Sequence, residues 1–168
     1  MVLTIYNIST SSHVNGLTVA NCQFEDIYYY GVRSYYNDSV QIVDNHFDPF
    51  RNNTTGYGIY IYYNDVVEVT GNEVQSVGTY ALYSYYTNDG STSNTSTIAN
   101  NLLNGRGTYG VYMYSNNNLN FYHNTINGGT HGMYLGGSTA SNFSTSIFAT
   151  TYLPLTVRAE GFGLLPLH

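Results

Sequence analysis

Two acidic residues stand at matching places in the sequence and could do chemistry together. Asp38 and Asp65 each follow a Tyr-Asn dipeptide and lie 27 positions apart. If the intervening segment forms one turn of a stacked structure, the two carboxylates lie about 5 Å apart. Such a pair could be the nucleophile and the acid of a retaining glycosidase, or could bind Ca²⁺. The alternative is ordinary turn chemistry, in which the carboxylate caps nearby backbone amides.

A second pair combines an imidazole with a carboxylate. His46 and Glu73 are also 27 positions apart, each directly after an Asn, and Asp44 lies beside His46. A histidine next to a carboxylate could serve as a general acid or base. The corresponding positions elsewhere are Gln23, Leu102 and Thr125, which favours an exposed and variable column. No Cys/His spacing suggests zinc, and no glycine-rich phosphate loop is present.

The segments that contain these pairs are copies of one repeat. An apolar residue precedes a key Asn by three positions, and another apolar residue follows it by two. The key position is occupied by Cys22, Asn45, Asn72, Asn101 and Asn124, with Ser146 as a degenerate sixth, at intervals of 22 to 29 residues. Each later copy opens with a small residue, namely Gly31, Gly58, Ala81, Gly110 and Gly132. Self-similarity at this period indicates a repeat architecture.

Each copy has the pattern of three short strands and no helical period. Such a coil can bury its apolar side only against the next coil, stacked in register at about 4.8 Å. The sequence therefore predicts an all-β parallel β-helix of about five to six coils of 22–29 residues, with three short strands per coil. At one corner, the amides of Asn45, Asn72, Asn101 and Asn124 are expected to form a structural ladder.

Strand alternation sends one column of tyrosines outward. In the strand after each opening small residue, the first and third residues are expected to face inward and the middle one outward. The outward column consists of Arg33, Tyr60, Tyr83, Tyr112 and Tyr134, and a second one of Tyr35, Tyr62, Tyr85 and Tyr114. A flat face of phenols suits stacking on sugar rings, with hydroxyls for the sugar oxygens. Alternatively, the tyrosines are present for their strand propensity and stack on their own copies.

The remaining composition limits partners and compartments. Charged residues make up 8% of 168 residues and the net charge is −6, which argues against a nucleic-acid partner. No apolar run approaches the ~20 residues that span a bilayer, so no membrane insertion is expected. The single cysteine, Cys22, excludes an internal disulfide. The first residues lack the basic segment of a signal peptide, which predicts a fragment that adjoins neighbouring coils or domains of a longer chain.

Three regions are expected along the chain. Residues 1–16 form a partial first coil, 17–149 the β-helix repeats, and 150–168 a C-terminal cap or frayed tail. The last region loses the Asn, gains two prolines and is rich in leucine.

The repeat resembles that of the right-handed parallel β-helix proteins of the pectate-lyase-like superfamily. Copies there have a Gly-Ile-x-apolar segment, an apolar pair, and then Asn-x-[Ile/Val/Phe], and the resemblance covers about residues 14 to 148. It implies a right-handed helix, and the superfamily includes polysaccharide lyases, glycoside hydrolases, surface adhesins and scaffolds. Lyases there use a basic residue near bound acids. Arg33, Arg51 and Arg106 are the only candidates within the repeats, and none lies in a recognisable catalytic motif.

The leading hypothesis is a fragment of an extracellular or cell-surface β-helix protein that binds carbohydrate, or adheres, through its tyrosine-lined face. The alternatives are a polysaccharide-degrading enzyme that uses one of the two residue pairs, and a structural spacer without a ligand. A polysaccharide or glycan is the expected partner. No cofactor is expected, with Ca²⁺ at the Asp38 and Asp65 pair as the exception.

Overall fold

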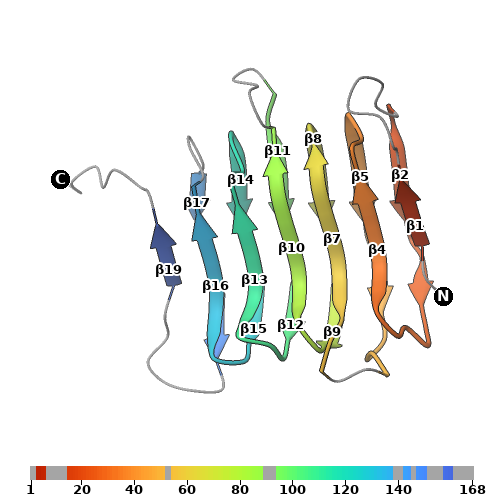
Figure 1. The fold of residues 1–168 in the computed structure, drawn as a ribbon, viewed down its shortest axis with the longest axis vertical. Coiled ribbons are helices and arrows are strands. Elements are labelled where there is room, and N and C mark those ends of the chain that lie inside the picture. The colour runs from red at the N-terminus through yellow and green to blue at the C-terminus, as the bar shows by residue number, and fades with distance from the viewer. Residues whose placement is uncertain are drawn as a thin grey trace.

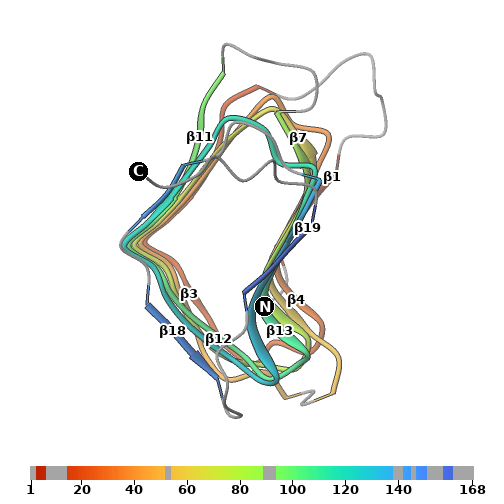
Figure 2. The same ribbon diagram turned by 90° about the vertical axis from the view of Figure 1, so that its left-hand side faces the viewer.

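The computed structural model describes residues 3–6, 15–51, 54–88, 94–137, 142–144, 147–150 and 157–160. These residues form strands, turns and loops, and the strands make three parallel sheets (Figure 1). Seen along the stacking direction, the sheets are the sides of one tube (Figure 2). Within the described ranges no helix is long and apolar enough to cross a bilayer.

The largest sheet, here called the tyrosine sheet, has seven strands side by side (Figure 1). They are β1 (Leu3–Tyr6), β4 (Tyr30–Tyr35), β7 (Tyr57–Asn64), β10 (Tyr80–Thr87), β13 (Tyr109–Tyr114), β16 (His131–Gly136) and β19 (Val157–Glu160). The residues of β19 lie in the region expected to be a cap or frayed tail, yet they continue this sheet, because Val157 pairs with Met133 of β16. Ser146, the degenerate sixth key position, lies outside the described residues.

Two six-stranded sheets complete the tube. The second sheet consists of β2 (Leu17–Ala20), β5 (Ser39–Val43), β8 (Val66–Thr70), β11 (Ser96–Ala99), β14 (Leu119–Tyr122) and β17 (Asn142–Ser144). The third sheet consists of β3 (Gln23–Phe24), β6 (His46–Phe47), β9 (Glu73–Val77), β12 (Leu102–Gly105), β15 (Thr125–Gly128) and β18 (Ile147–Thr150). The chain adds one strand to each sheet per coil, so the predicted parallel β-helix with three strands per coil is confirmed.

The core follows the predicted alternation. In β7, Ile59 and Ile61 are buried and Tyr60 between them points outward, and the other tyrosine-sheet strands from β4 to β16 repeat this pattern. The apolar residues on both sides of the key Asn are also buried: Val19, Ile42, Val69, Ile98 and Phe121 before it, and Phe24, Phe47, Val74, Leu103 and Ile126 after it. Each coil therefore buries its apolar side against its neighbours.

Gly58 is closely packed where the tyrosine sheet meets the third sheet. A Cβ atom on Gly58 would lie 2.4 Å from Cγ1 of Val74 and 2.5 Å from the carbonyl oxygen of Ala81. Both distances are shorter than real Cβ contacts, so a side chain at Gly58 would require the side chain of Val74 and the backbone of Ala81 to shift. The small residue that opens each copy is thus explained by packing.

A buried asparagine ladder lies at the corner between the second and third sheets. The backbone N–H and the Nδ2 of Asn45 both donate to Oδ1 of Asn72, at 3.0 Å each. Asn72 donates in the same way to Asn101 at 2.9 and 3.0 Å, and Asn101 to Asn124 at 3.1 and 2.9 Å. Nδ2 also reaches the coil before, since that of Asn72 donates to the carbonyl of Ile42 at 2.7 Å. Each rung therefore connects three coils.

The residue directly before each key position of the repeat (Cys22 or a ladder Asn) has left-handed backbone geometry. This column consists of Asn21, Asp44, Gly71, Asn100 and His123, with φ of 54°, 53°, 69°, 58° and 54°. Asn, Asp and Gly tolerate this geometry better than other residues do. The corner is therefore sharp and has the same shape in consecutive coils (Figure 2).

A second polar column, which the sequence analysis missed, lies where the tyrosine sheet turns toward the second sheet. It consists of Asn37, Asn64, Thr87 and Asn116, with Ser34 and Ser84 beside it, and all six are buried. Asn37 N–H and Ser34 Oγ each donate to Oδ1 of Asn64 at 3.0 Å, and Ser84 Oγ donates to Oδ1 of Asn116 at 2.6 Å. The sequence feature that could have revealed this column is the Asn that directly precedes both Asp38 and Asp65.

We expect Asn72→Ala to lower the free energy of unfolding by roughly 3 kcal/mol, since it leaves buried donors of Asn45 and the carbonyl of Ile42 without partners. Asn127→Ala is the matched control, because Asn127 is exposed on β15 and its loss should cost under ~0.5 kcal/mol. Denaturant unfolding of both variants measures the difference. Equal midpoints would show that the ladder does not hold the coils together.

Candidate functional site

The outer face of the tyrosine sheet is the largest candidate site. Among the tyrosines whose side chains the structure describes, fifteen lie in four columns on it or directly after its strands. The columns are Tyr30, Tyr57, Tyr80 and Tyr109; Tyr60, Tyr83, Tyr112 and Tyr134, which continue from Arg33; Tyr35, Tyr62, Tyr85 and Tyr114; and Tyr36, Tyr63 and Tyr86. The parallel register places equivalent residues of consecutive coils side by side, which brings the predicted residues of the middle column together.

Within the middle column, from Tyr60 to Tyr134, the rings stack face to face. The ring centroids are 4.7 Å apart for Tyr60 and Tyr83, 5.2 Å for Tyr83 and Tyr112, and 4.7 Å for Tyr112 and Tyr134, with interplanar angles of 6° to 13°. Neighbouring phenols of this column therefore cover one another's faces and leave their rims only partly accessible to solvent. Stacking on their own copies, the alternative that the sequence left open, is present here.

Arg33 takes the place of a tyrosine at one end of the middle column. Its guanidinium carbon lies 4.6 Å from the ring centre of Tyr30 and 4.4 Å from that of Tyr35, within cation–π range. Burial lowers the pKa of Arg33, but the hydrogen bond to Tyr35 and the nearby phenols outweigh it, so that the net shift is upward. From β4 to β16 the described outward side chains of this sheet include no carboxylate, although the chain is acidic overall.

The packing also changes the acidity of the phenols. Burial, reinforced by the neighbouring phenol of Tyr86, raises the pKa of Tyr85 to about 12. Burial raises the pKa of Tyr60 and of Tyr83 further still, and adjacent tyrosines add to the effect. The phenols of Tyr60, Tyr83 and Tyr85 therefore keep their protons well beyond neutral pH.

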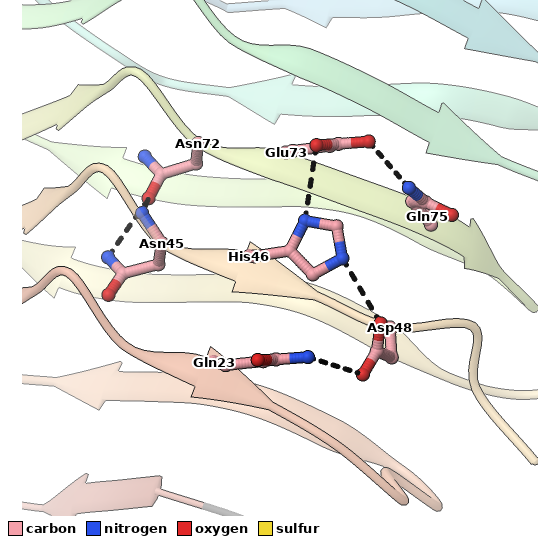
Figure 3. A network of polar contacts seen from close by, with 7 residues as sticks. All are labelled: Gln23, Asn45, His46, Asp48, Asn72, Glu73 and Gln75. Carbon is pink, nitrogen blue, oxygen red and sulfur yellow. Dashed lines mark hydrogen bonds and ion pairs between the residues drawn. The ribbon is translucent and has the colours of Figure 1, made fainter.

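The second candidate, His46 with Glu73, is part of a polar network on the third sheet (Figure 3). Nδ1 of His46 lies 3.1 Å from Oε2 of Glu73, one coil along, and Nε2 lies 3.1 Å from Oδ1 of Asp48. Gln23 donates to the other oxygen of Asp48 at 3.2 Å, and Gln75 to the other oxygen of Glu73 at 2.5 Å. The network thus spans three consecutive coils.

The structure pairs His46 and Glu73 and adds Asp48, which the sequence analysis missed. The sequence feature that could have revealed Asp48 is its position two residues after His46, because strand alternation places residues two apart on the same side of the chain. Both ring nitrogens of His46 contact carboxylates, so one contact must open before the imidazole can exchange a proton with a substrate. The three side chains are 36%, 31% and 41% exposed for His46, Asp48 and Glu73, which places the network on open surface.

The first acidic pair lies at equivalent positions of adjacent coils. The N–H of Val66 donates to the carbonyl of Asp38 at 2.8 Å, and that of Asp65 to the carbonyl of Asn37 at 3.1 Å. No group of three or more His, Cys, Asp or Glu suited to a metal ion occurs in the described part of the chain. Ca²⁺ takes six to eight oxygen ligands, so this pair would need further donors. Its catalytic role and Ca²⁺ binding stay predictions.

With this geometry in place, comparison with known proteins identifies the family. Residues 5–148 match the family model described as the right handed beta helix region, so the chain belongs to this family. Neither a curated protein nor a solved structure matches the chain.

The raised phenol pKa values predict a loss of stability in alkali. These tyrosines hold their protons more tightly in the folded chain than in the unfolded one, whose phenols titrate near 10.0. Their contribution to stability is therefore fully present below pH 10 and is lost as the pH rises toward 12 and beyond. Phenolate absorbance and denaturant midpoints, followed over this range, measure it. Titration of all phenols together near 10, with constant stability, would contradict the packing.

Proposed function

We propose that this chain is part of an extracellular or cell-surface protein that binds carbohydrate through the tyrosine sheet. The observation that carries the proposal is the regular array of outward phenol rims, with ring centres 4.7 to 5.3 Å apart within the middle two columns from Tyr60 and Tyr35 onward. Each rim offers a hydroxyl that both donates and accepts hydrogen bonds, next to apolar ring edges. Sugar chains present the same alternation of hydroxyl and C–H groups.

The stacking of the tyrosines on one another determines how a glycan would bind. Because the ring faces are covered, a sugar would contact hydroxyls and ring edges rather than lie on an exposed face. Each such contact is weak, so affinity would grow with the number of sugar units that span several columns or coils. Long polysaccharides are therefore better ligands than single sugars in this proposal.

Polysaccharide hydrolysis is the second candidate function, and one observation favours it: His46 lies between the carboxylates of Glu73 and Asp48. This network belongs to the third sheet, whereas the phenol array belongs to the tyrosine sheet. A glycan bound on the phenols would thus lie on a different sheet from His46. Binding is consequently the better-supported function of the tyrosine face.

We expect the triple variant Tyr83→Phe, Tyr85→Phe, Tyr112→Phe to weaken binding while its rings remain stacked. Loss of three hydroxyls, each worth about 0.5–1.5 kcal/mol in a hydrogen bond, should raise the Kd by roughly 10-fold to roughly 2,000-fold. Tyr122→Phe, on β14 of the second sheet, is the matched control and should bind like the parent chain. Titration calorimetry with long oligosaccharides from neutral and acidic polysaccharides measures the effect.

Two results would contradict the proposal. Absence of binding to every polysaccharide of the panel would leave the spacer function, with the tyrosines as packing devices alone. Release of new reducing ends by the parent chain, abolished in His46→Ala, would show that hydrolysis at the third sheet is the main activity.

A further inference from the structure

The tyrosine sheet is also a connected network of oxidisable phenols. Successive ring centres along one path lie close enough for van der Waals contact between the rings. The path runs from Tyr134 to Tyr112 at 4.7 Å, to Tyr83 at 5.2 Å, to Tyr60 at 4.7 Å, to Tyr30 at 5.5 Å and to Tyr29 at 4.6 Å. Aromatic rings in such contact exchange an electron readily. When one phenol is oxidised, the radical can therefore move to a neighbouring phenol.

This path ends at Tyr29, and Tyr28 and Tyr29 are the most exposed tyrosines of the described residues. Tyr29 is 38% exposed and Tyr28 beside it is 64% exposed, whereas the column tyrosines are only partly accessible. The ring of Tyr29 touches the network at two points, 4.6 Å from Tyr30 and 5.8 Å from Tyr57. The turn before β4 is therefore where the network of ring contacts reaches the solvent-exposed surface.

Loss of the phenol proton determines where a tyrosyl radical is stable, and it favours the exposed turn. A phenol that loses an electron becomes strongly acidic, and it forms a stable neutral radical only when its proton leaves. Burial raises the pKa of Tyr60 and of Tyr83, so these phenols are poorly placed to give their protons to solvent. Tyr28 and Tyr29 face water, which accepts the proton at once.

We propose that Tyr28 and Tyr29 are an oxidative modification site, where radicals gathered by the tyrosine sheet join two copies of this chain through a dityrosine bond. The oxidant is hydrogen peroxide acting through a haem peroxidase. It takes one electron and one proton from a phenol on each copy and is reduced to water. The two radicals form one carbon–carbon bond between their ortho positions, and each ortho hydrogen then moves to its phenol oxygen.

The stacked geometry favours coupling at the turn over coupling inside the sheet. A new bond between ortho carbons brings two rings edge to edge, but Tyr83 and Tyr112 lie face to face with an interplanar angle of 6°. Coupling there would require both rings to leave the stack. The exposed ring of Tyr28 can meet the same residue of a second copy without that cost.

The test treats the chain with limiting hydrogen peroxide and a haem peroxidase, then measures covalent dimer on denaturing gels and dityrosine by fluorescence. Tyr28→Phe with Tyr29→Phe should remove most of the dimer. Tyr30→Phe with Tyr57→Phe keeps both exposed phenols and the ring packing but replaces the two phenols that Tyr29 contacts in the network, so dimer per oxidising equivalent should fall severalfold. Tyr122→Phe is the control and should behave like the parent chain.

Two outcomes would overturn the proposal. Undiminished dimer in the Tyr28→Phe and Tyr29→Phe chain would place the coupling elsewhere. Undiminished dimer in the Tyr30→Phe and Tyr57→Phe chain would show direct oxidation of the exposed phenols, without a contribution from the sheet. Circular dichroism confirms that each variant is folded. The inference does not depend on carbohydrate binding, because no glycan takes part in the measurement.

Discussion

The structure depends on hydrogen bonds that can form in only one register, those of the buried asparagine ladder. The amide of Asn72 joins three coils at once, through Asn45, Asn101 and the carbonyl of Ile42. A slip of one residue between coils would remove the rung and turn every side chain of the strand to the opposite face. Such a slip would bury phenols and expose the apolar core, so ladder and core together specify one alignment.

The tyrosine face is a consequence of this alignment. The spacing between hydrogen-bonded strands places equivalent phenols at stacking distance, as the 4.7 Å between Tyr60 and Tyr83 illustrates. The rings of the middle column cover one another and leave their rims only partly accessible to solvent. The same stacking thus makes the face a regular hydroxyl surface, raises the phenol pKa values and links the rings electronically. Recognition of glycans and transport of oxidising equivalents are both proposed as results of one packing arrangement.

The features that could be predicted from the sequence are those that recur in several copies of the repeat. The three-strand coil, the inward residues such as Ile59 and Ile61, and the tyrosine-rich surface all follow from columns that repeat over several copies. The second polar column was missed because Asn37 and Asn64 were attributed to local turns, and burial distinguishes the two cases only in three dimensions. Asp48 was missed because no other copy repeats it. Whether the tyrosines stack on sugars or on one another depends on their side-chain rotamers, which cannot be deduced from the aligned repeats of the sequence.

Native-state hydrogen exchange of the ladder amides tests the central claim most directly. The backbone N–H groups of Asn45, Asn72 and Asn101 each donate to the next Asn side chain, inside the buried corner. If the ladder holds the coils in register, these three amides should exchange only through global unfolding, with the free energy measured by denaturant. Exchange through local opening, as fast as that of exposed loop amides, would show that the register depends on the apolar core alone.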